Sequence, residues 1–343
     1  MAFRDVVDQH HAVRLLRTAA RTGRASHAYL LVGPSGVGRR TLALAFAQYL
    51  NCPQADLDAC GVCRDCVRIA QGQHPDVRVL DMAADRWLVP PPREHRGREI
   101  PIDQVRALRQ DAAYPPYEGR VKVYIIADAE LLSPGAANSL LKVLEEPPPY
   151  VVIVLIAEST VSLPPTVLSR CQVVRCALLS ASEVERALVE RYGVPAERAR
   201  FLAAIAAGRL GRALAWAQDE SRLAARRRFL DLLGELETAT DTQRLDAAEA
   251  LARDRDLLPD LLELAAFWYR DLLVWQETQD PTLLVNRDRE AEVRRWAAIL
   301  TPEDLHRRFD AVEHAKDSLE RNVQPRLLLE RLFFQLRSPA VPA

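Results

Sequence analysis

A glycine-rich segment near the N-terminus has residue types and spacing suited to holding phosphate groups. Gly33, Gly36 and Gly38 match the glycines of a nucleotide-binding P-loop, which reads G-x-x-x-x-G-K-[S/T]. In a working loop the lysine reaches the β- and γ-phosphates and the hydroxyl binds Mg²⁺. Arg39 stands at the lysine position and Arg40 at the hydroxyl position, where it offers no oxygen to the metal. We therefore predict a nucleotide site that is degenerate and inactive.

The surroundings of this loop favour a nucleotide-binding fold over a plain structural turn, although glycine-rich turns are common. Residues 27–32 form a short apolar run typical of a strand, and residues 42–50 form an apolar-periodic helix. A strand, a glycine loop and a helix in this order are the setting that a P-loop requires. Thr41 carries a hydroxyl, but it lies one residue late and about 100° further round that helix, so it does not replace the missing ligand.

A second part of such a site is also degenerate. In P-loop ATPases an Asp that closes a buried strand holds Mg²⁺, and a following Glu activates the attacking water. The apolar run at residues 121–127 has Ala127 at the metal position, followed by Asp128, an acid shorter than Glu. Alanine cannot bind a cation. Two independent defects therefore argue against ATP hydrolysis by this chain.

Four of the six cysteines have the spacing C-x7-C-x2-C-x2-C. They are Cys52, Cys60, Cys63 and Cys66. Four thiolates at such spacings suit tetrahedral Zn²⁺ and leave no open position, so we predict a structural zinc module at residues 52–66. The alternative is four unlinked core thiols, against which two overlapping C-x-x-C pairs argue. Cys171 and Cys176 are interpreted as ordinary packing residues.

The elements that must position these residues alternate between strand and helix up to about residue 178. Strands are expected at residues 28–32, 77–80, 121–127, 151–157 and 172–175, and helices between them include residues 41–50, 102–113 and 134–146. This alternation predicts an α/β fold with a parallel sheet flanked by helices. An irregular loop is expected at residues 87–101, which are rich in proline and whose arginines could be merely solvated.

Beyond residue 178 the strand pattern stops and helical patterns continue. Residues 180–192, 195–206 and 211–218 read as three helices of a small domain, and residues 220–337 read as long amphipathic helices broken at prolines. We therefore predict three domains: residues 1–178 with the cysteine module inserted at 52–66, a small helical domain at 179–219 and an all-helical domain at 220–343.

The composition of the 343-residue chain is that of an ordinary globular protein, with 49% hydrophobic residues, 27% charged residues and a net charge of −1. This balance excludes a strong polyanion binder as a whole, so contact with nucleic acid would need a local patch or partner subunits. No apolar run is long enough to cross a membrane, and the N-terminus lacks the apolar core of a signal peptide. We expect a cytoplasmic protein without a membrane partner.

Several segments resemble the bacterial DNA polymerase III clamp-loader family. They are residues 131–133, residues 138–148, the Ser169-Arg170-Cys171 motif that ends residues 163–171, the four-cysteine module and an N-terminal box at residues 3–10. The resemblance covers residues 3 to 220 with specific motifs, and the C-terminal helices less specifically. It implies an AAA+ P-loop module, a helical lid at 179–219 and a helical collar at 220–343 that would hold a ring together. The alternative for the apolar positions of the collar is a self-contained bundle core.

The resemblance also implies partners. In this family a hetero-pentamer of one delta-prime, three gamma or tau motor subunits and one delta subunit opens a sliding clamp and places it on primer-template DNA, within the DNA polymerase III holoenzyme. Motor subunits have intact nucleotide motifs and delta-prime subunits have eroded ones. The altered motif residues Arg39, Arg40 and Ala127 favour the delta-prime kind of subunit. The segment His74-Pro75-Asp76 favours it too, because it is similar to the delta-prime sequence.

Arg170 is the residue that the resemblance places closest to catalysis. In AAA+ rings a neighbouring subunit donates an arginine that stabilises charge on the γ-phosphate, and the Ser-Arg-Cys motif implies this role in trans. The alternative is that Arg170 merely pairs with a nearby acid. In the lid, the usual sensor arginine falls on Gly211, with Arg212 adjacent and its role open, and Glu158 stands where active members carry Thr. We therefore expect no ATPase activity of the chain itself, and contact with ATP only at a neighbour's site.

Two rival functions belong to different classes. The first is a motor subunit whose Arg39 tolerates ATP, which detectable ATP binding by the lone chain would favour. The second is a zinc-bearing nucleic-acid-binding module that acts alone, which salt-sensitive DNA binding would favour and against which the net charge of −1 counts.

Overall fold

The computed structural model of the chain describes residues 2–82, 85–90, 99–254, 257–320 and 323–337. It forms two compact units, one of residues 1–193 with 207–212 and one of residues 194–206 with 213–343. The predicted division into three domains at residues 178 and 219 stays a prediction. Residues 91–98 of the expected irregular loop lie outside the described residues.

The first unit is built on a parallel five-stranded sheet in the order β2-β3-β4-β1-β5. The strands are β1 (Ala28–Val32), β2 (Val77–Leu80), β3 (Lys122–Ile126), β4 (Val151–Ala157) and β5 (Gln172–Arg175). Every residue of β1, β3 and β4 is buried, because these strands lie inside the sheet with helices on both faces. The predicted parallel α/β sheet is therefore confirmed, with each strand within one residue of its expected bounds.

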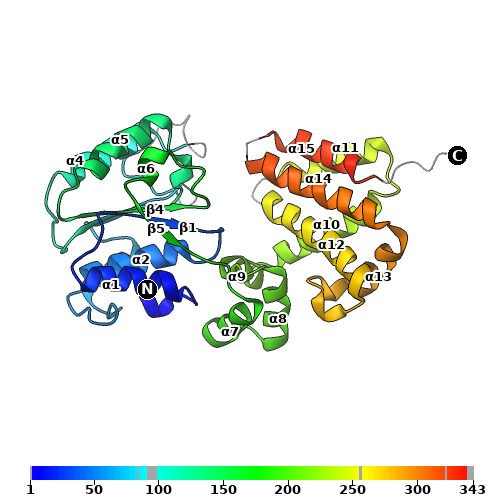
Figure 1. The fold of residues 1–343 in the computed structure, drawn as a ribbon, viewed down its shortest axis with the longest axis horizontal. Helices are drawn as coiled ribbons and strands as arrows, with labels where there is room; N and C mark the ends of the chain where they lie inside the picture. The colour runs from blue at the N-terminus through cyan, green and yellow to red at the C-terminus, as the bar shows by residue number, and fades with distance from the viewer. Residues whose placement is uncertain (1, 83–84, 91–98, 255–256, 321–322, 338–343) are drawn as a thin grey trace. The chain divides into compact units, whose positions relative to one another are not determined.

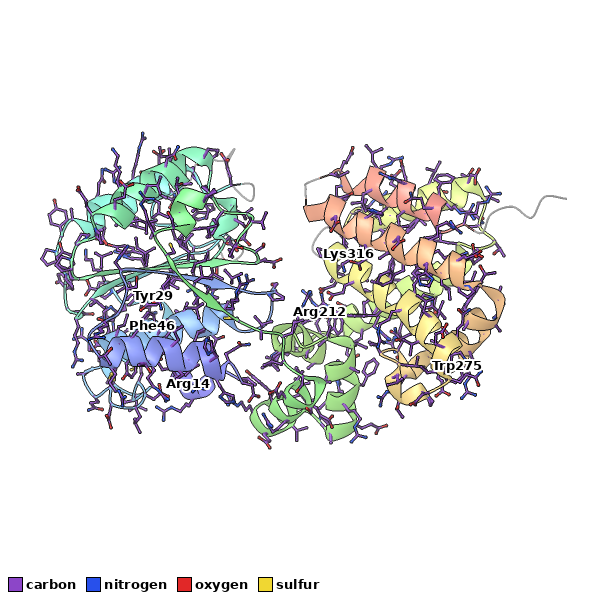
Figure 2. All side chains as sticks on the ribbon, in the orientation of Figure 1. Arg14, Tyr29, Phe46, Arg212, Trp275 and Lys316 are labelled. Carbon is purple, nitrogen blue, oxygen red and sulfur yellow. The ribbon has the colours of Figure 1, made fainter. Side chains whose placement is uncertain are left out.

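Helices cover both faces of this sheet (Figure 1). One face carries α1 (His10–Arg21) and α2 (Arg39–Asn51), and the other carries α4 (Ile102–Ala112), α5 (Pro134–Glu145) and α6 (Pro165–Leu168). Alternate residues of β1 point to the two faces, as strand geometry requires. Tyr29 packs edge-on against Phe46 of α2, with 5.1 Å between the ring centroids (Figure 2), whereas Leu30 belongs to the core on the opposite face.

Four further helical elements complete the described part of the first unit. They are the 3-10 turns η1 (Phe3–Asp5) and η3 (Ala129–Leu131), the helix α3 (Arg64–Gln71) beyond the cysteines, and α7 (Ala181–Tyr192). Ser180 caps α7 by accepting a hydrogen bond from the backbone N–H of Glu183, whose carboxylate accepts one from Ser180 in return. The chain then leaves the sheet and continues as helices.

The second unit is helical over the described residues. Its helices are α8 (Ala196–Ile205), α10 (Glu220–Glu235), α11 (Asp241–Leu251), α12 (Leu258–Thr278), α13 (Glu290–Ile299), α14 (Pro302–Glu320) and α15 (Pro325–Gln335), and α9 (Leu210–Gln218) runs from the first unit into the second. The prediction of a helical C-terminal region is therefore confirmed. None of the helices within the described ranges is both long enough and apolar enough to cross a membrane.

A buried polar network closes the interior of the second unit. The fully buried carboxylate of Asp271 accepts hydrogen bonds from the backbone N–H groups of Val285 and Asn286 at 3.1 and 2.7 Å. Buried Arg226 donates to Asn286 at 2.6 Å and to both carboxylate oxygens of Asp288. Buried charges are tolerated when they are paired and hydrogen-bonded, so this network fixes how α10 meets the loop before α13.

Candidate functional site

The glycine loop lies where the fold places phosphate-binding loops, between the end of the inner strand β1 at Val32 and the start of α2 at Arg39. Gly38 begins the helix with a φ of 100°, which a residue with a side chain rarely adopts. A Cβ atom at Gly33 would overlap the carbonyl oxygen of Cys176. Both glycines are therefore required by the backbone path, whether or not the loop holds a ligand.

The two arginines of the loop pair with acids of the same chain. The guanidinium of Arg39 is 10% exposed and its Nη2 lies 3.6 Å from a carboxylate oxygen of Glu158. The Nη1 atom of Arg40 forms an ion pair with a carboxylate oxygen of Asp81, whose side chain is buried. Charges that would otherwise face a phosphate are thus matched by carboxylates within the chain.

Asp81 was missed as a site residue in the sequence, although a signal was present. It follows directly on the predicted strand at residues 77–80, and the carboxyl ends of parallel strands meet at one edge of the sheet. The ion pair between Asp81 and Arg40 also depends on the path of α2 across the sheet, and local sequence patterns do not predict that path.

The strand that would supply the metal ligand ends without one. The backbone N–H of Ala127 donates to the carbonyl of Leu80 at 2.9 Å, and its methyl side chain has no ligand atom. Asp128 accepts a hydrogen bond from the backbone N–H of Met82 at 2.9 Å. Burial raises the pKa of Asp128, as it also raises that of Glu130, and nearby Arg39 and Arg40 only partly oppose the rise. The carboxylates that follow β3 thus belong to Asp128 and Glu130, and position 127 carries none.

The segment after α8 closes directly over the glycine loop. The backbone N–H of Gly211 donates to the carbonyl of Gly36 at 2.8 Å, and a Cβ atom at Gly211 would lie 3.0 Å from the Cα of Gly36. A side chain at Gly211 would therefore press against the backbone of the glycine loop. Arg212, labelled in Figure 2, is buried beside it.

Arg170 lies between α6 and β5 and is held by its surroundings. Its Nη2 atom is 2.7 Å from a carboxylate oxygen of Glu145, at the end of α5. Its Nη1 donates to the carbonyl of Thr166 at 2.9 Å and to the hydroxyl of Ser169 at 3.3 Å. About a third of the side chain is exposed. The ion pair that the alternative interpretation predicts is thus present, and a partly exposed guanidinium remains at the surface.

The four cysteines of the predicted zinc module converge. The sulfur atoms of Cys52, Cys60, Cys63 and Cys66 all lie within 4.8 Å of one another, and those of Cys60 and Cys66 are 4.0 Å apart. Ligands of a tetrahedral zinc–thiolate site lie roughly 3.8 Å apart, because each Zn–S bond is about 2.3 Å. The cluster therefore could hold a metal ion such as zinc.

Backbone N–H groups are aimed at the sulfur atoms, as in metal–thiolate sites. The N–H of Cys60 donates to the sulfur of Cys52 at 3.4 Å, and the N–H of Cys63 donates to that of Cys60 at 3.3 Å. Hydrogen bonds from the backbone of Val62 and Cys63 lower the pKa of the Cys60 thiol to about 6. Burial raises the pKa of Cys66. At least one thiolate is therefore favoured before any metal binds.

The cysteine module is tied to the N-terminal turn. The backbone N–H groups of Phe3 and Arg4 donate to the carboxylate of Asp58 at 2.9 and 3.0 Å. The guanidinium of Arg4 donates to the carbonyls of Ala59 and Cys60 at 2.5 and 3.1 Å. The N-terminal box and the module are thus one structural assembly, a link that their separation in the sequence hides.

The His74-Pro75-Asp76 motif has a structural task. The buried carboxylate of Asp76 accepts hydrogen bonds from the backbone N–H groups of Tyr117, Glu118 and Gly119 at 2.7 to 2.9 Å. Burial opposes ionisation, but these hydrogen bonds outweigh it and hold the pKa of Asp76 below its usual value. The motif fixes the loop that leads into β3.

Three other possible ligands approach one another near this motif. Atoms of Asp65, His74 and Glu118 lie within 4.8 Å of one another. The Nδ1 atom of His74, however, accepts a hydrogen bond from the backbone N–H of Asp76 at 3.1 Å. The neutral ring then carries its proton on Nε2, which faces the two acids as a donor. Arg68 also pairs with Glu118, so this cluster is interpreted as a polar contact.

Known proteins resemble the chain over both units. Residues 8–179 match the family described as DNA polymerase III, delta subunit, and residues 220–338 match its C-terminal family. The DNA polymerase III subunit delta′ of Bacillus subtilis is 30% identical over 338 residues, which cover 96% of both chains. The sequence similarity therefore extends over nearly the full length of this relative.

Subunits named tau or gamma/tau are also similar to the chain. The DNA polymerase III subunit tau of Bacillus subtilis is 36% identical over 171 residues, covering 50% of this chain and 28% of the relative. The gamma/tau subunit of Mycobacterium tuberculosis is 29% identical over 377 residues, covering 99% of this chain and 61% of the relative. The chain thus spans less than two thirds of these relatives. A solved gamma subunit-related protein from Thermotoga maritima is 19% identical, with a TM-score of 0.41 and coverage of 94% and 98% of the two chains.

Two matched regions and a relative aligned along its whole length agree with the parallel α/β sheet and the helical C-terminal unit. The family is that of the clamp-loader subunits whose motifs the sequence carries. The chain belongs to the DNA polymerase III delta-subunit family and is a clamp-loader subunit of the delta-prime type.

Proposed function

We propose that this subunit does not hydrolyse ATP and serves as a fixed member of a clamp-loader ring. The observation that carries the proposal is the internal pairing of both loop arginines, Arg39 with Glu158 and Arg40 with Asp81. A lysine and a hydroxyl at these positions would be available to phosphate and Mg²⁺. The contact between Gly211 and Gly36 supports the same conclusion, because backbone fills the sensor position.

The pure chain should therefore show no Mg²⁺-dependent ATPase activity above background. The matched variant for this measurement is Asp128→Ala, because Asp128 is the first acid after the end of β3. Robust turnover by the wild-type chain that this variant abolishes would instead support a motor subunit that tolerates Arg39.

The partners follow from the family. The proposed assembly contains gamma or tau motor subunits and a delta subunit in a hetero-pentamer. This complex would open the sliding clamp and place it on primer-template DNA, so the chain would meet DNA through the complex. The cytoplasm is the proposed location.

Arg170 is proposed to act in trans on ATP bound by a neighbouring motor subunit. Its guanidinium is partly exposed, and Glu145, Thr166 and Ser169 hold it in one orientation before any partner arrives. Preorganisation of this kind avoids the cost of ordering a long side chain in the complex. An arginine finger stabilises charge that develops on the transferred phosphoryl group and is worth about 10³–10⁵ in rate at its own site.

Two variants distinguish a finger from a structural ion pair. Arg170→Ala removes the guanidinium, whereas Glu145→Gln removes the charge of its partner and leaves the guanidinium in place. We expect both complexes to assemble, with a partial loss of clamp- and DNA-stimulated ATPase for Arg170→Ala and a much smaller change for Glu145→Gln. The loss is partial because other ATP sites of the ring keep their own arginines.

Equal losses for the two variants, or failure of both to assemble, would assign Arg170 a structural role. A fully active complex with Arg170→Ala would also reject the finger. Assembly is measured by size-exclusion chromatography of the mixed subunits, and turnover by phosphate release.

Zinc is the metal proposed for the cysteine cluster, with a structural role. Four thiolates complete a tetrahedral site and exclude substrate or water as a further ligand. Freshly purified protein should contain about one zinc per chain, measured by elemental analysis, and Cys63→Ser should release it while the sheet stays folded. Cys176→Ser is the control, because Cys176 is a buried cysteine outside the cluster. Wild-type protein without zinc, or equal loss from both variants, would contradict this assignment.

A further inference from the structure

An arginine-lined pocket on the outer helices has no part in the function proposed above. Its volume is about 350 Å³, and it lies in the first unit between η1, α1 and the end of α7. The charged side chains that line it are Arg4, Asp8, His10, Arg14, Arg17 and Arg191. Arg14 is labelled in Figure 2 on the helix layer below the sheet.

The helix α1 supplies most of this charge. His10, Arg14, Arg17 and Arg21 recur every three or four residues, which places them along one face, and the helix contains no acidic residue. Its opposite face is buried through Ala12 and Leu16. The basic residues are therefore turned away from the core as a stripe.

Most of these arginines lack an ionic partner. Among the residues that the structure describes, no acid forms an ion pair with Arg14, Arg17 or Arg191. The one acid lining the pocket, Asp8, already pairs with Arg186 at 2.8 Å and contacts His10 at 3.1 Å. In a chain with a net charge of −1, this is a local excess of positive charge.

The chemistry of the stripe selects among anionic partners. Arginine presents a planar fork that binds phosphate oxygens in pairs, and successive arginines along a helix follow a chain of phosphates. A membrane surface is not favoured, because an interfacial helix needs an exposed apolar face and the apolar face of α1 is buried.

We propose that α1 and the pocket beside it bind the phosphate backbone of DNA, through Arg14, Arg17 and Arg191. This goes beyond the function proposed above, in which the chain meets DNA only through the assembled ring. Because the chain matches DNA polymerase III delta-subunit families along both units, DNA binding by the lone chain would add a contact to this subunit and would not identify a nucleic-acid-binding module that acts alone. Arg4 is not counted among the binding residues, because its guanidinium is engaged by Ala59, Cys60 and Asp58. Failure of this inference would leave clamp loading by the ring unaffected.

The test uses the full chain and a fluorescent 20-base-pair duplex, with anisotropy measured at several salt concentrations from about 50 mM upward. The double variant Arg14→Gln/Arg17→Gln removes two charges from the stripe. Its control, Arg253→Gln/Arg326→Gln, removes two charges from exposed arginines of the second unit that already pair with Glu249. Both variants have the same net charge, so they differ only in the position of the two charges that are removed.

We expect salt-dependent binding by the wild-type chain, at least tenfold weaker binding by the stripe variant, and little change for the control. The slope of log affinity against log salt should fall by about two, because each phosphate contact contributes roughly 0.9. Absence of wild-type binding at the lowest salt, or equal weakening of both variants, would overturn the proposal. So would displacement of the duplex by poly-glutamate at equal charge concentration, which would indicate an acidic protein as the partner.

Discussion

At the scale of single residues, both arginines of the glycine loop lie beside carboxylates of the same chain. Arg39 and Arg40 are introduced where a ligand would supply negative charge, and Glu158 and Asp81 supply it instead. A buried guanidinium without such a partner would cost several kcal/mol. The acids therefore belong to the degenerate site as much as the arginines do.

Asp76 gives a residue-scale prediction about stability. Asp76→Asn replaces one carboxylate oxygen with an amide group that faces backbone N–H donors, so we expect a loss of about 1–3 kcal/mol in the free energy of unfolding. Urea denaturation of the variant measures this loss. The control is Asp246→Asn on the exposed surface of α11, which should change stability little. Equal stability of the two variants would mean that the three hydrogen bonds contribute nothing net.

The pH dependence of this contribution has a definite sign. The pKa of Asp76 is lower in the folded chain than its ordinary value of 3.8. A group of this kind stabilises the fold above its unfolded pKa, and the stabilisation is lost as the pH falls through the folded pKa. The difference in free energy of unfolding between the wild-type protein and Asp76→Asn should therefore shrink below about pH 4. A difference that stays constant down to pH 2 would contradict the lowered pKa of Asp76.

At the scale of elements, the strands could be predicted because each is a short, continuous apolar run between turn residues. The glycine loop could be placed for the same reason, since it joins such a run to a periodic helix. The ion pair of Arg40 with Asp81 could not be predicted from the sequence, because it depends on where the end of β2 lies relative to α2. The hydrogen bonds between the N-terminal turn and Asp58 could not be predicted either, because no local sequence pattern indicates them.

The contact between the glycine loop and Gly211 gives an element-scale prediction. Gly211→Ala would place a Cβ atom 3.0 Å from the Cα of Gly36, which is tighter than most Cβ contacts in proteins. We expect the variant to lose about 1–3 kcal/mol of stability, because backbone must move to relieve the overlap. Thermal denaturation measures the change.

The matched control is Gly135→Ala in α5, where the nearest atom to a new Cβ is 3.5 Å away. Alanine favours helix over glycine, so this variant should be neutral or slightly more stable. A Gly211→Ala protein as stable as the Gly135→Ala protein would show that the loop adapts without cost.

At the scale of the whole molecule, the two compact units divide the helices differently from the sequence pattern. The helix α8 groups with the C-terminal helices, and its Arg198 donates to the carbonyl of Ala217 at 3.2 Å and to Glu220 at 2.5 Å. Arg226 of α10 also stacks over the ring of Phe201 in α8, at 5.3 Å from its centroid. A cut after residue 219 therefore removes partners of α8.

A fragment of residues 1–219 tests the role of the remaining helices. We expect its sheet to fold, with less helix per residue than the full chain, and we expect it not to join the clamp-loader complex. Circular dichroism measures the helix content, and co-purification with the partner subunits measures assembly. The full chain in the same mixture is the control. Full incorporation of the fragment would show that residues 220–343 are not the assembly domain.

The strand order has a consequence for synthesis of the chain on the ribosome. β1 pairs with β4 and β5, so Ala28 meets Ile153 only after more than a hundred further residues have been made. At ordinary rates of translation, this wait lasts on the order of ten seconds. During that time an entirely apolar strand has neither of its neighbours, and its unpaired edges are open to other nascent chains. Molecular chaperones that cover such segments would therefore act on β1 before any other strand of the sheet.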